Sequence, residues 1–128
     1  MLRIVEIHPA TTARGEYIVL QNLGLVTVNL RGWALCNDGY LSNDPDQIGS
    51  SMYVFRDDVA IKPYTRVVLF TGEGENGWLP TTDGKQAYCV FWGRGERLWA
   101  ASPNVHVLQM LASRPIKPEA LPTVAAHA

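Results

Sequence analysis

The side chains that could act as nucleophiles or bases are few and scattered. They are Cys36, Cys89, His8, His106 and His127. Cys89 with His106 is the one conceivable nucleophile and base pair, provided that their strands are neighbours. The residues around Cys89 are Tyr88, Val90 and Phe91, and such apolar surroundings raise the pKa of a thiol instead of activating it. We therefore expect packed histidines and no enzyme activity.

The two cysteines also bear on disulfide and zinc chemistry. Two thiols alone make neither a zinc site nor the disulfide framework of a small secreted domain. A single disulfide between Cys36 and Cys89 is an open alternative, because both lie in expected strands that could face each other. Buried, unbridged thiols are the preferred interpretation.

Acidic side chains gather in the polar stretch 37–51 and shortly after it. They are Asp38, Asp44 and Asp46, followed by Asp57 and Asp58. The segment that starts at Asp44 begins like an EF-hand, but Ile48 and Phe55 occupy positions where calcium needs oxygen ligands. A looser calcium site built from these aspartates is an alternative to a solvated loop. We expect no metal and no other cofactor.

Two arginines lie between two large aromatic residues late in the chain. Arg94 and Arg97 fall within the segment 93–97, and Trp92 and Trp99 flank it. An arginine beside an aromatic ring can hold a carboxylate, a phosphate or a stacked ring. The alternative, which we favour, places both tryptophans in the core and leaves both arginines solvated.

Trp78 lies in the polar segment 73–86, which we expect to be a loop. An exposed tryptophan indicates a contact surface, and with Tyr40 or Tyr53 it could stack on a sugar ring. Equally, Trp78 can fold back over the end of the protein as a lid. The candidate binding residues are Trp78, Arg94, Arg97 and Tyr40.

The apolar pattern predicts the elements that must position these residues, and all of them are strands. Short segments rich in β-branched and aromatic residues alternate with clusters of Gly, Pro, Asn and Asp, and no long window keeps a helical period. The expected strands are Leu2 to His8, Glu16 to Asn22, Val26 to Leu30, Trp33 to Asn37, Tyr53 to Phe55, Arg66 to Thr71, Ala87 to Trp92 and His106 to Met110.

The stretch GEYIVLQNLGLVTVNLRGWAL, from Gly15 to Leu35, is the most regular part of this pattern. Asn22 and Gly24 are expected to reverse the chain, because both residue types tolerate a left-handed backbone. Gly32 then turns the chain so that Trp33 enters a strand and joins two sheets. The expected core residues are Trp33, Ile18, Leu20, Val28, Leu30 and Leu35.

Composition and charge limit the classes of function. The chain has 128 residues, 47% of them hydrophobic, which fits one globular domain. We place that domain at residues 1–112 and a proline-containing, disordered tail at 113–128. The formal net charge is −1 with no block of either sign, so nucleic acid is not an expected partner. With no leader and no membrane span in the sequence, a cytoplasmic location is expected.

The regular stretch resembles the signature of the lamin tail domain family, which runs roughly E-Y-[IV]-x-[IL]-x-N-x-G, V-x-L, G-W-x-L. The matching positions are Glu16 to Asn22, Gly24, Val28 to Leu30, Gly32, Trp33 and Leu35. Weaker likenesses extend the resemblance to about residues 2–111. Tyr64 stands where the family has Gly after Pro63, and we predict a type I turn there because Tyr resists a positive φ.

The resemblance implies an immunoglobulin-like β-sandwich of the bacterial, single-domain type that is not an enzyme. We therefore predict a non-catalytic binding or assembly module. Its partner is expected to be another protein or a second copy of the chain, contacted through loops or a strand edge. The alternative is a domain that binds carbohydrate or nucleic acid through Trp78, Arg94 and Arg97.

Overall fold

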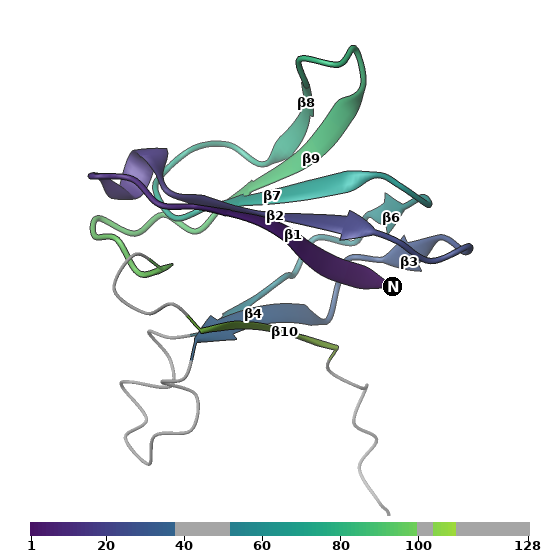
Figure 1. Ribbon diagram of the computed structural model, residues 1–128, viewed down its shortest axis with the longest axis horizontal. Helices are drawn as coiled ribbons and strands as arrows, with labels where there is room; N and C mark the ends of the chain where they lie inside the picture. The colour runs from purple at the N-terminus through teal and green to yellow at the C-terminus, as the bar shows by residue number, and fades with distance from the viewer. Residues whose placement is uncertain (38–51, 100–103, 110–128) are drawn as a thin grey trace, which may run out of the picture.

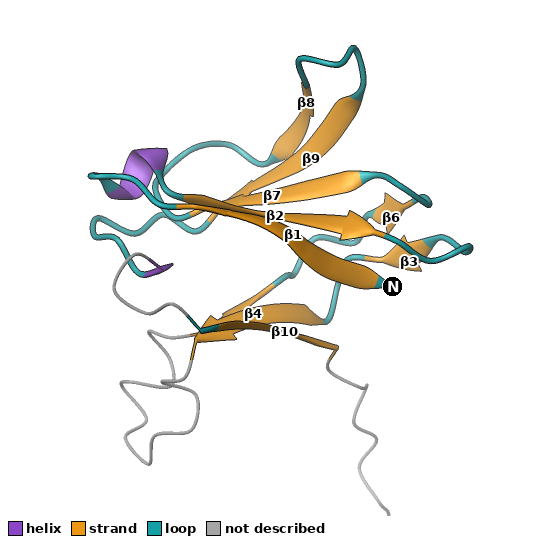
Figure 2. Ribbon diagram, viewed as in Figure 1, coloured by secondary structure: helices purple, strands orange, loops and turns teal. Residues whose placement is uncertain are grey.

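The computed structural model describes residues 1–37, 52–99 and 104–109, and in these ranges the protein is all-β (Figure 2). The strands are β1 (Leu2–His8), β2 (Tyr17–Asn22), β3 (Val28–Asn29), β4 (Trp33–Asn37), β5 (Met52–Val54), β6 (Ala60–Ile61), β7 (Arg66–Phe70), β8 (Gly77–Pro80), β9 (Gln86–Phe91) and β10 (Val105–Gln109). A short 3₁₀ turn, η1 (Ala13–Gly15), leads into β2. Within the described ranges, no helix has the length and apolar character needed to cross a membrane.

The strands form a five-stranded, a three-stranded and a two-stranded sheet. Their orders are β1-β2-β7-β9-β8, β10-β4-β5 and β3-β6. Neighbouring strands are antiparallel except β7 and β9, which run parallel. In Figure 1 the five-stranded sheet lies over β4 and β10. Facing sheets of this kind are consistent with a β-sandwich.

The hydrophobic core lies between the facing sheets, because alternate residues of each strand point inward. Of the expected core residues, the buried ones are Ile18, Leu20, Leu30, Trp33 and Leu35. Val28 is only partly buried and packs against this core from the small sheet. Gly32 has a φ of 92°, which turns the chain into Trp33 as expected.

The segment after β2 differs from the expected tight reversal. β3 pairs with β6 and not with β2, which lies between β1 and β7. The prediction of a left-handed backbone at Asn22 and Gly24 is wrong, because neither is among the described residues with a positive φ. Gly24 is needed for space instead, since a Cβ there would lie 2.9 Å from the Met1 nitrogen.

The side chain of Asn22 holds this loop in place. Its amide nitrogen donates to the carbonyl oxygens of Val26 and Ile61, each at 2.9 Å. Its amide oxygen accepts from the Gly24 nitrogen and from the Met1 amine, also each at 2.9 Å. Asn22 is fully buried, and these four bonds use all of its hydrogen-bonding capacity.

The carboxyl group of Glu16, just before β2, also holds distant segments in place through buried hydrogen bonds. Its Oε1 atom accepts hydrogen bonds from the Thr71 hydroxyl at 2.7 Å, the Leu98 nitrogen at 2.9 Å and the Trp99 nitrogen at 3.1 Å. Glu16 is fully buried. Because a buried carboxyl group needs such donors, its position fixes the end of β7 and the segment after β9 relative to β2.

Two strands, β6 and β8, were not expected from the sequence. β8 exists because Gly77 to Pro80 pair with Cys89 to Gln86 of β9. A strand this short, with only Trp78 and Leu79 as large apolar residues, shows no period that a sequence pattern can detect. The prediction that Trp78 lies in a loop is therefore wrong.

Replacing Asn22 with alanine tests its role as an anchor. Asn22→Ala leaves the carbonyl groups of Val26 and Ile61 without this donor, so the free energy of unfolding is expected to fall by about 2–4 kcal/mol. The control is Asn29→Ala, at an exposed asparagine on β3, with an expected loss below about 1 kcal/mol. Urea unfolding measures both changes, and equal losses would contradict the anchor.

Candidate functional site

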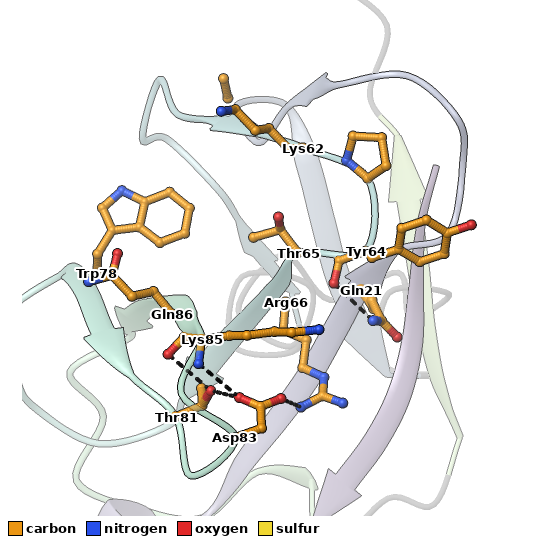
Figure 3. Close-up of a pocket in the computed structure, with 12 residues that line it drawn as sticks. Gln21, Lys62, Tyr64, Thr65, Arg66, Trp78, Thr81, Asp83, Lys85 and Gln86 are labelled. Carbon is orange, nitrogen blue, oxygen red and sulfur yellow. Dashed lines mark hydrogen bonds and ion pairs between the residues drawn. The ribbon is translucent and has the colours of Figure 1, made fainter.

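A pocket opens where β7 and β9 begin, and Figure 3 shows its lining. We call it the aromatic pocket and define it by the turn 62–65, Gln21, Arg66, Trp78 and the hairpin 81–86. Its volume is about 540 Å³. In Figure 3 Tyr64 and Trp78 stand on opposite sides, with Thr65 and Arg66 between them. Trp78 thus forms one side of the pocket and the Tyr64 turn the other, with the Tyr64 ring directed away from Trp78.

Tyr64 has a backbone conformation that favours glycine. Its φ is 67°, and no other non-glycine residue in the described part of the chain has a positive φ. The Thr65 nitrogen donates to the Lys62 carbonyl oxygen at 3.1 Å, which closes a four-residue turn with Tyr64 third. A positive φ at this place marks a type II turn, so the prediction of a type I turn is wrong.

Hydrogen bonds from β2 impose this conformation on Tyr64. Its nitrogen donates to the Asn22 carbonyl oxygen at 2.6 Å, and its carbonyl oxygen accepts from the Gln21 side-chain amide at 2.9 Å. A left-handed backbone costs a non-glycine residue about 1–2 kcal/mol. The Tyr64 side chain is 63% exposed, so little burial of the ring offsets that cost.

Trp78 supplies the opposite side of the aromatic pocket. Its ring packs edge to face on Tyr88 with the ring centres 5.3 Å apart, and the side chain remains 42% exposed. The Tyr88 hydroxyl donates to Asp57, and burial, followed by this contact, raises the pKa of Tyr88 to about 12. A neutral, fixed Tyr88 therefore holds the indole of Trp78 while part of it faces solvent.

The polar part of the pocket is organised around Asp83. Its carboxylate accepts from the Thr81 hydroxyl and from the Lys85 nitrogen at 3.2 Å, and it lies 3.8 Å from an Arg66 nitrogen. The Thr81 contact first, and the Lys85 contact second, lower the pKa of Asp83. Within the described residues, the side-chain amines of Lys62 and Lys85 form no hydrogen bond or ion pair. These amines are available to a ligand.

The face of the five-stranded sheet that points away from the core forms the outer groove, a hollow of about 660 Å³. Paired residues share a face of a sheet, so its side chains line up in rows across the strands. The rows are His8, Tyr17, Phe70 and Phe91; then Glu6, Val19, Val68 and Cys89; then Gln21, Arg66, Ala87 and Leu79. Val5 and Leu79 are 44% and 46% exposed. This outer face is mostly apolar.

The first row of the outer groove is a continuous aromatic stack. The ring centres are 4.5 Å apart for His8 and Tyr17, 5.4 Å for Tyr17 and Phe70, and 4.8 Å for Phe70 and Phe91. Gly74 packs on the last ring, since a Cβ there would lie 2.5 Å from Phe91. The stack therefore gives one border of the groove a fixed shape.

The two arginines expected in a binding site lie beyond the other end of β9, away from Trp78. The Arg94 guanidinium sits 5.0 Å from the centre of the Trp92 ring, which in turn lies 5.9 Å from the ring of buried Trp99. Arg97 donates to the Ala10 carbonyl oxygen at 3.1 Å. Trp99 thus lies in the core and Trp92 packs against it, as in the alternative that we favoured, whereas both arginines contact the protein.

The structure therefore divides the candidate binding residues. Trp78 lines the aromatic pocket, whereas Arg94 and Arg97 lie at the far end of β9, and Tyr40 lies outside the described residues. Tyr53, the other aromatic considered with Trp78, packs its ring against Phe55 and Trp92. The sequence grouped these residues as candidates for one binding surface. It could not separate them, because the paths of the loops between them do not follow from the sequence.

The groups considered for catalysis lie apart. Cys36 and Cys89 are buried and form no disulfide. Cys89 is on β9 and His106 on β10, strands of different sheets, and burial raises the pKa of the Cys89 thiol. In the described ranges, no three His, Cys, Asp or Glu residues are placed to hold a metal ion, and Asp38, Asp44 and Asp46 lie outside those ranges.

The aromatic pocket and the outer groove include residues that the sequence did not single out. No sequence motif marks the pocket residues Tyr64, Lys62 and Lys85. The pocket forms only where a turn and a distant hairpin meet in the fold. The outer groove did leave a signal. The runs 17–20, 67–70 and 88–91 are apolar at consecutive positions, which is typical of strands covered on both faces.

Glycine at position 64 tests the strain in the turn. Tyr64→Gly removes the left-handed penalty, and after the larger unfolded-state entropy of glycine the protein is expected to gain about 1 kcal/mol of stability. Tyr64→Ala keeps a Cβ at the same φ, so it is the matched control and should bring no gain. Chemical unfolding measures both, and a loss of stability in Tyr64→Gly would show that the ring stabilises the fold.

No protein-family model matches the chain, and no curated protein matches it either. The function must therefore be inferred from the surfaces themselves. The two that carry an inference are the apolar outer groove and the cationic, aromatic pocket beside it.

Proposed function

We propose that the protein is a non-catalytic assembly module that pairs with a second copy of itself through the outer groove. Its fold is proposed to be an immunoglobulin-like sandwich of the lamin tail type. The observation that carries the assembly function is the apolar character of a sheet face that points away from the core. The proposed contact surface is the face of the five-stranded sheet, whereas the sequence led us to expect loops or a strand edge.

An apolar outer face needs a covering partner. A sheet that packs one face on the core normally presents polar side chains on the other face to water. Here the middle row of that face contains Val19, Val68 and Cys89, and exposed Val5 and Leu79 lie at its sides. Val19 and Cys89 are already buried in the single chain, so a partner would remove from water chiefly Val5, Leu79 and the accessible part of Val68. Burial of this apolar area favours association by about 25 cal/mol per Å².

The charges at the margin of the groove favour a second copy as the partner. Glu6 and Arg66 line the same groove, on β1 and β7. In a two-fold dimer each surface meets its own copy, so Glu6 of one molecule can approach Arg66 of the other. A face that carries one acidic and one basic group in this way is complementary to itself, whereas a face of one sign would repel its copy.

The edges of the five-stranded sheet are less suited to association than its face. β8 forms one edge and ends at Pro80, which has no backbone N–H to donate to a new strand. β1 forms the other edge, and its register shifts between Ile4 and Glu6. Irregular or proline-bearing edges are typical of sheets that avoid edge pairing.

The lamin-tail assignment is supported by what the motif residues do. Glu16 and Asn22, the two polar ends of the E-Y-[IV]-x-[IL]-x-N stretch, are both buried and both bind backbone groups of distant segments. A Cβ at position 24 would clash with the Met1 backbone, and Gly32 has a positive φ, so both positions need glycine. These four motif residues thus have structural roles, as expected of a fold signature.

Charge placed in the groove tests the assembly. Sedimentation velocity at increasing concentration is expected to show a dimer of the unaltered protein. Leu79→Glu puts a carboxylate into the covered face, and the dimer dissociation constant is expected to rise at least about tenfold. Leu25→Glu is the matched control, because Leu25 is 87% exposed outside the groove, and it should leave the dimer unchanged.

Two results would overturn the proposed assembly. One is a protein that stays monomeric at the highest soluble concentration. The other is a dimer that Leu79→Glu and Leu25→Glu affect equally. Val5→Glu provides a second variant in the groove, at the opposite side of the sheet, in case Leu79→Glu disturbs β8 itself.

A further inference from the structure

We propose that the aromatic pocket binds an acidic saccharide, that is, a sugar ring bearing a carboxylate. This inference goes beyond the proposed assembly, because it concerns the pocket at the start of β7 and β9 and not the apolar rows of the outer groove. It rests on the exposed indole of Trp78, two available amines and a strained turn that line one hollow (Figure 3).

The strained turn is the first observation. Tyr64 keeps a φ of 67° that glycine would adopt without strain, while its ring remains 63% exposed. Strain of this kind persists where the surrounding structure imposes it, and it clusters at ligand sites. Gln21 and Asn22 hold the Tyr64 backbone from β2. The strained turn thus forms the border of the pocket opposite Trp78.

The opposite side of the pocket has the surface that a sugar ring needs. Trp78 is 42% exposed and is fixed from behind by Tyr88. An indole offers a flat apolar face with an electron-rich quadrupole, on which the C–H face of a pyranose can stack. The volume of about 540 Å³ lies in the range of pockets for small ligands and has room for one or two sugar rings.

The charge of the lining specifies an anionic ligand. The lining has a net charge of +2, from the three basic residues Lys62, Arg66 and Lys85 and the acidic Asp83. The whole chain, in contrast, has a formal net charge of −1. Arg66 is already close to Asp83, at 3.8 Å. The Lys62 and Lys85 amines are therefore the groups that would bind the carboxylate of the sugar.

The remaining polar groups fit sugar hydroxyls better than phosphates. Thr65, Thr81 and Gln86 line the pocket, and hydroxyl and amide groups both donate and accept hydrogen bonds, as sugar hydroxyls do. The ionised Asp83 carboxylate accepts from a sugar hydroxyl, and it repels a doubly charged phosphate more strongly than a singly charged carboxylate. A single nucleic-acid strand also needs a basic track along several phosphates, and this chain is slightly acidic.

Calorimetric titration of carboxylate-bearing oligosaccharides tests the proposal. The probes are trigalacturonate, a hyaluronan tetrasaccharide and sialyllactose, each with its carboxyl-reduced counterpart, and lactose as a neutral sugar. At least one acidic probe is expected to bind with a Kd below about 1 mM, and its reduced form at least about tenfold more weakly. Added salt should weaken the binding, because the lysine amines are exposed to screening.

Substitutions then locate the site. Trp78→Ala and the paired change Lys62→Ala with Lys85→Ala are each expected to weaken binding at least about tenfold. Urea unfolding of each variant checks that a loss of binding does not reflect misfolding. Arg97→Ala removes a cation at the far end of β9 and should leave binding unchanged.

Several outcomes would overturn the proposal. They are no binding of any acidic probe at about 10 mM, equal binding of the reduced forms, binding that survives Trp78→Ala, or tighter binding of a single-stranded oligothymidylate. Repeating the titration in Leu79→Glu separates this site from the assembly. Binding that persists in a monomer would support the pocket whether or not the dimer proposal stands.

Discussion

The fold depends on two buried polar side chains that fix β2 at both ends. Glu16 accepts three hydrogen bonds just before the strand, from the end of β7 and from the segment after β9. Asn22 closes the strand by binding backbone groups of the β3 and β6 region. Buried polar groups are costly unless they are fully bonded, so each one allows a single arrangement of the segments around it. The sheets are thereby held in register around a common core.

Both candidate surfaces follow from this central strand. Its inner residues, Ile18 and Leu20, fill the core, while Tyr17 and Val19 lie on the outer face and build the outer groove with β7. Where β2 ends, Gln21 and Asn22 hold the backbone of the strained turn that opens the aromatic pocket. One strand thus contributes to the core, to the proposed dimer face and to the proposed sugar site, and the last two share a border at Gln21 and Arg66.

Sequence patterns identified what depends on local alternation. The all-β class follows from period-two apolar segments, and the burial of Ile18, Leu20 and Leu35 follows from the same alternation. The patterns failed where tertiary pairing overrides local preference. β8 forms because β9 is its neighbour, and Tyr64 takes a positive φ, against the preference of tyrosine, because β2 binds its backbone on both sides.

The sequence by itself determined that strands form, which of their side chains turn inward, and that Gly32 turns the chain into Trp33. These features depend on residues that are neighbours in the chain. Only the tertiary structure decided that Trp78 shares a pocket with Tyr64 and the lysines, and that Arg94 and Arg97 lie at the far end of β9. The physical reason is that a site of this kind joins a turn to a hairpin about twenty residues away, and only the pairing of β7 with β9 and β8 sets their distance.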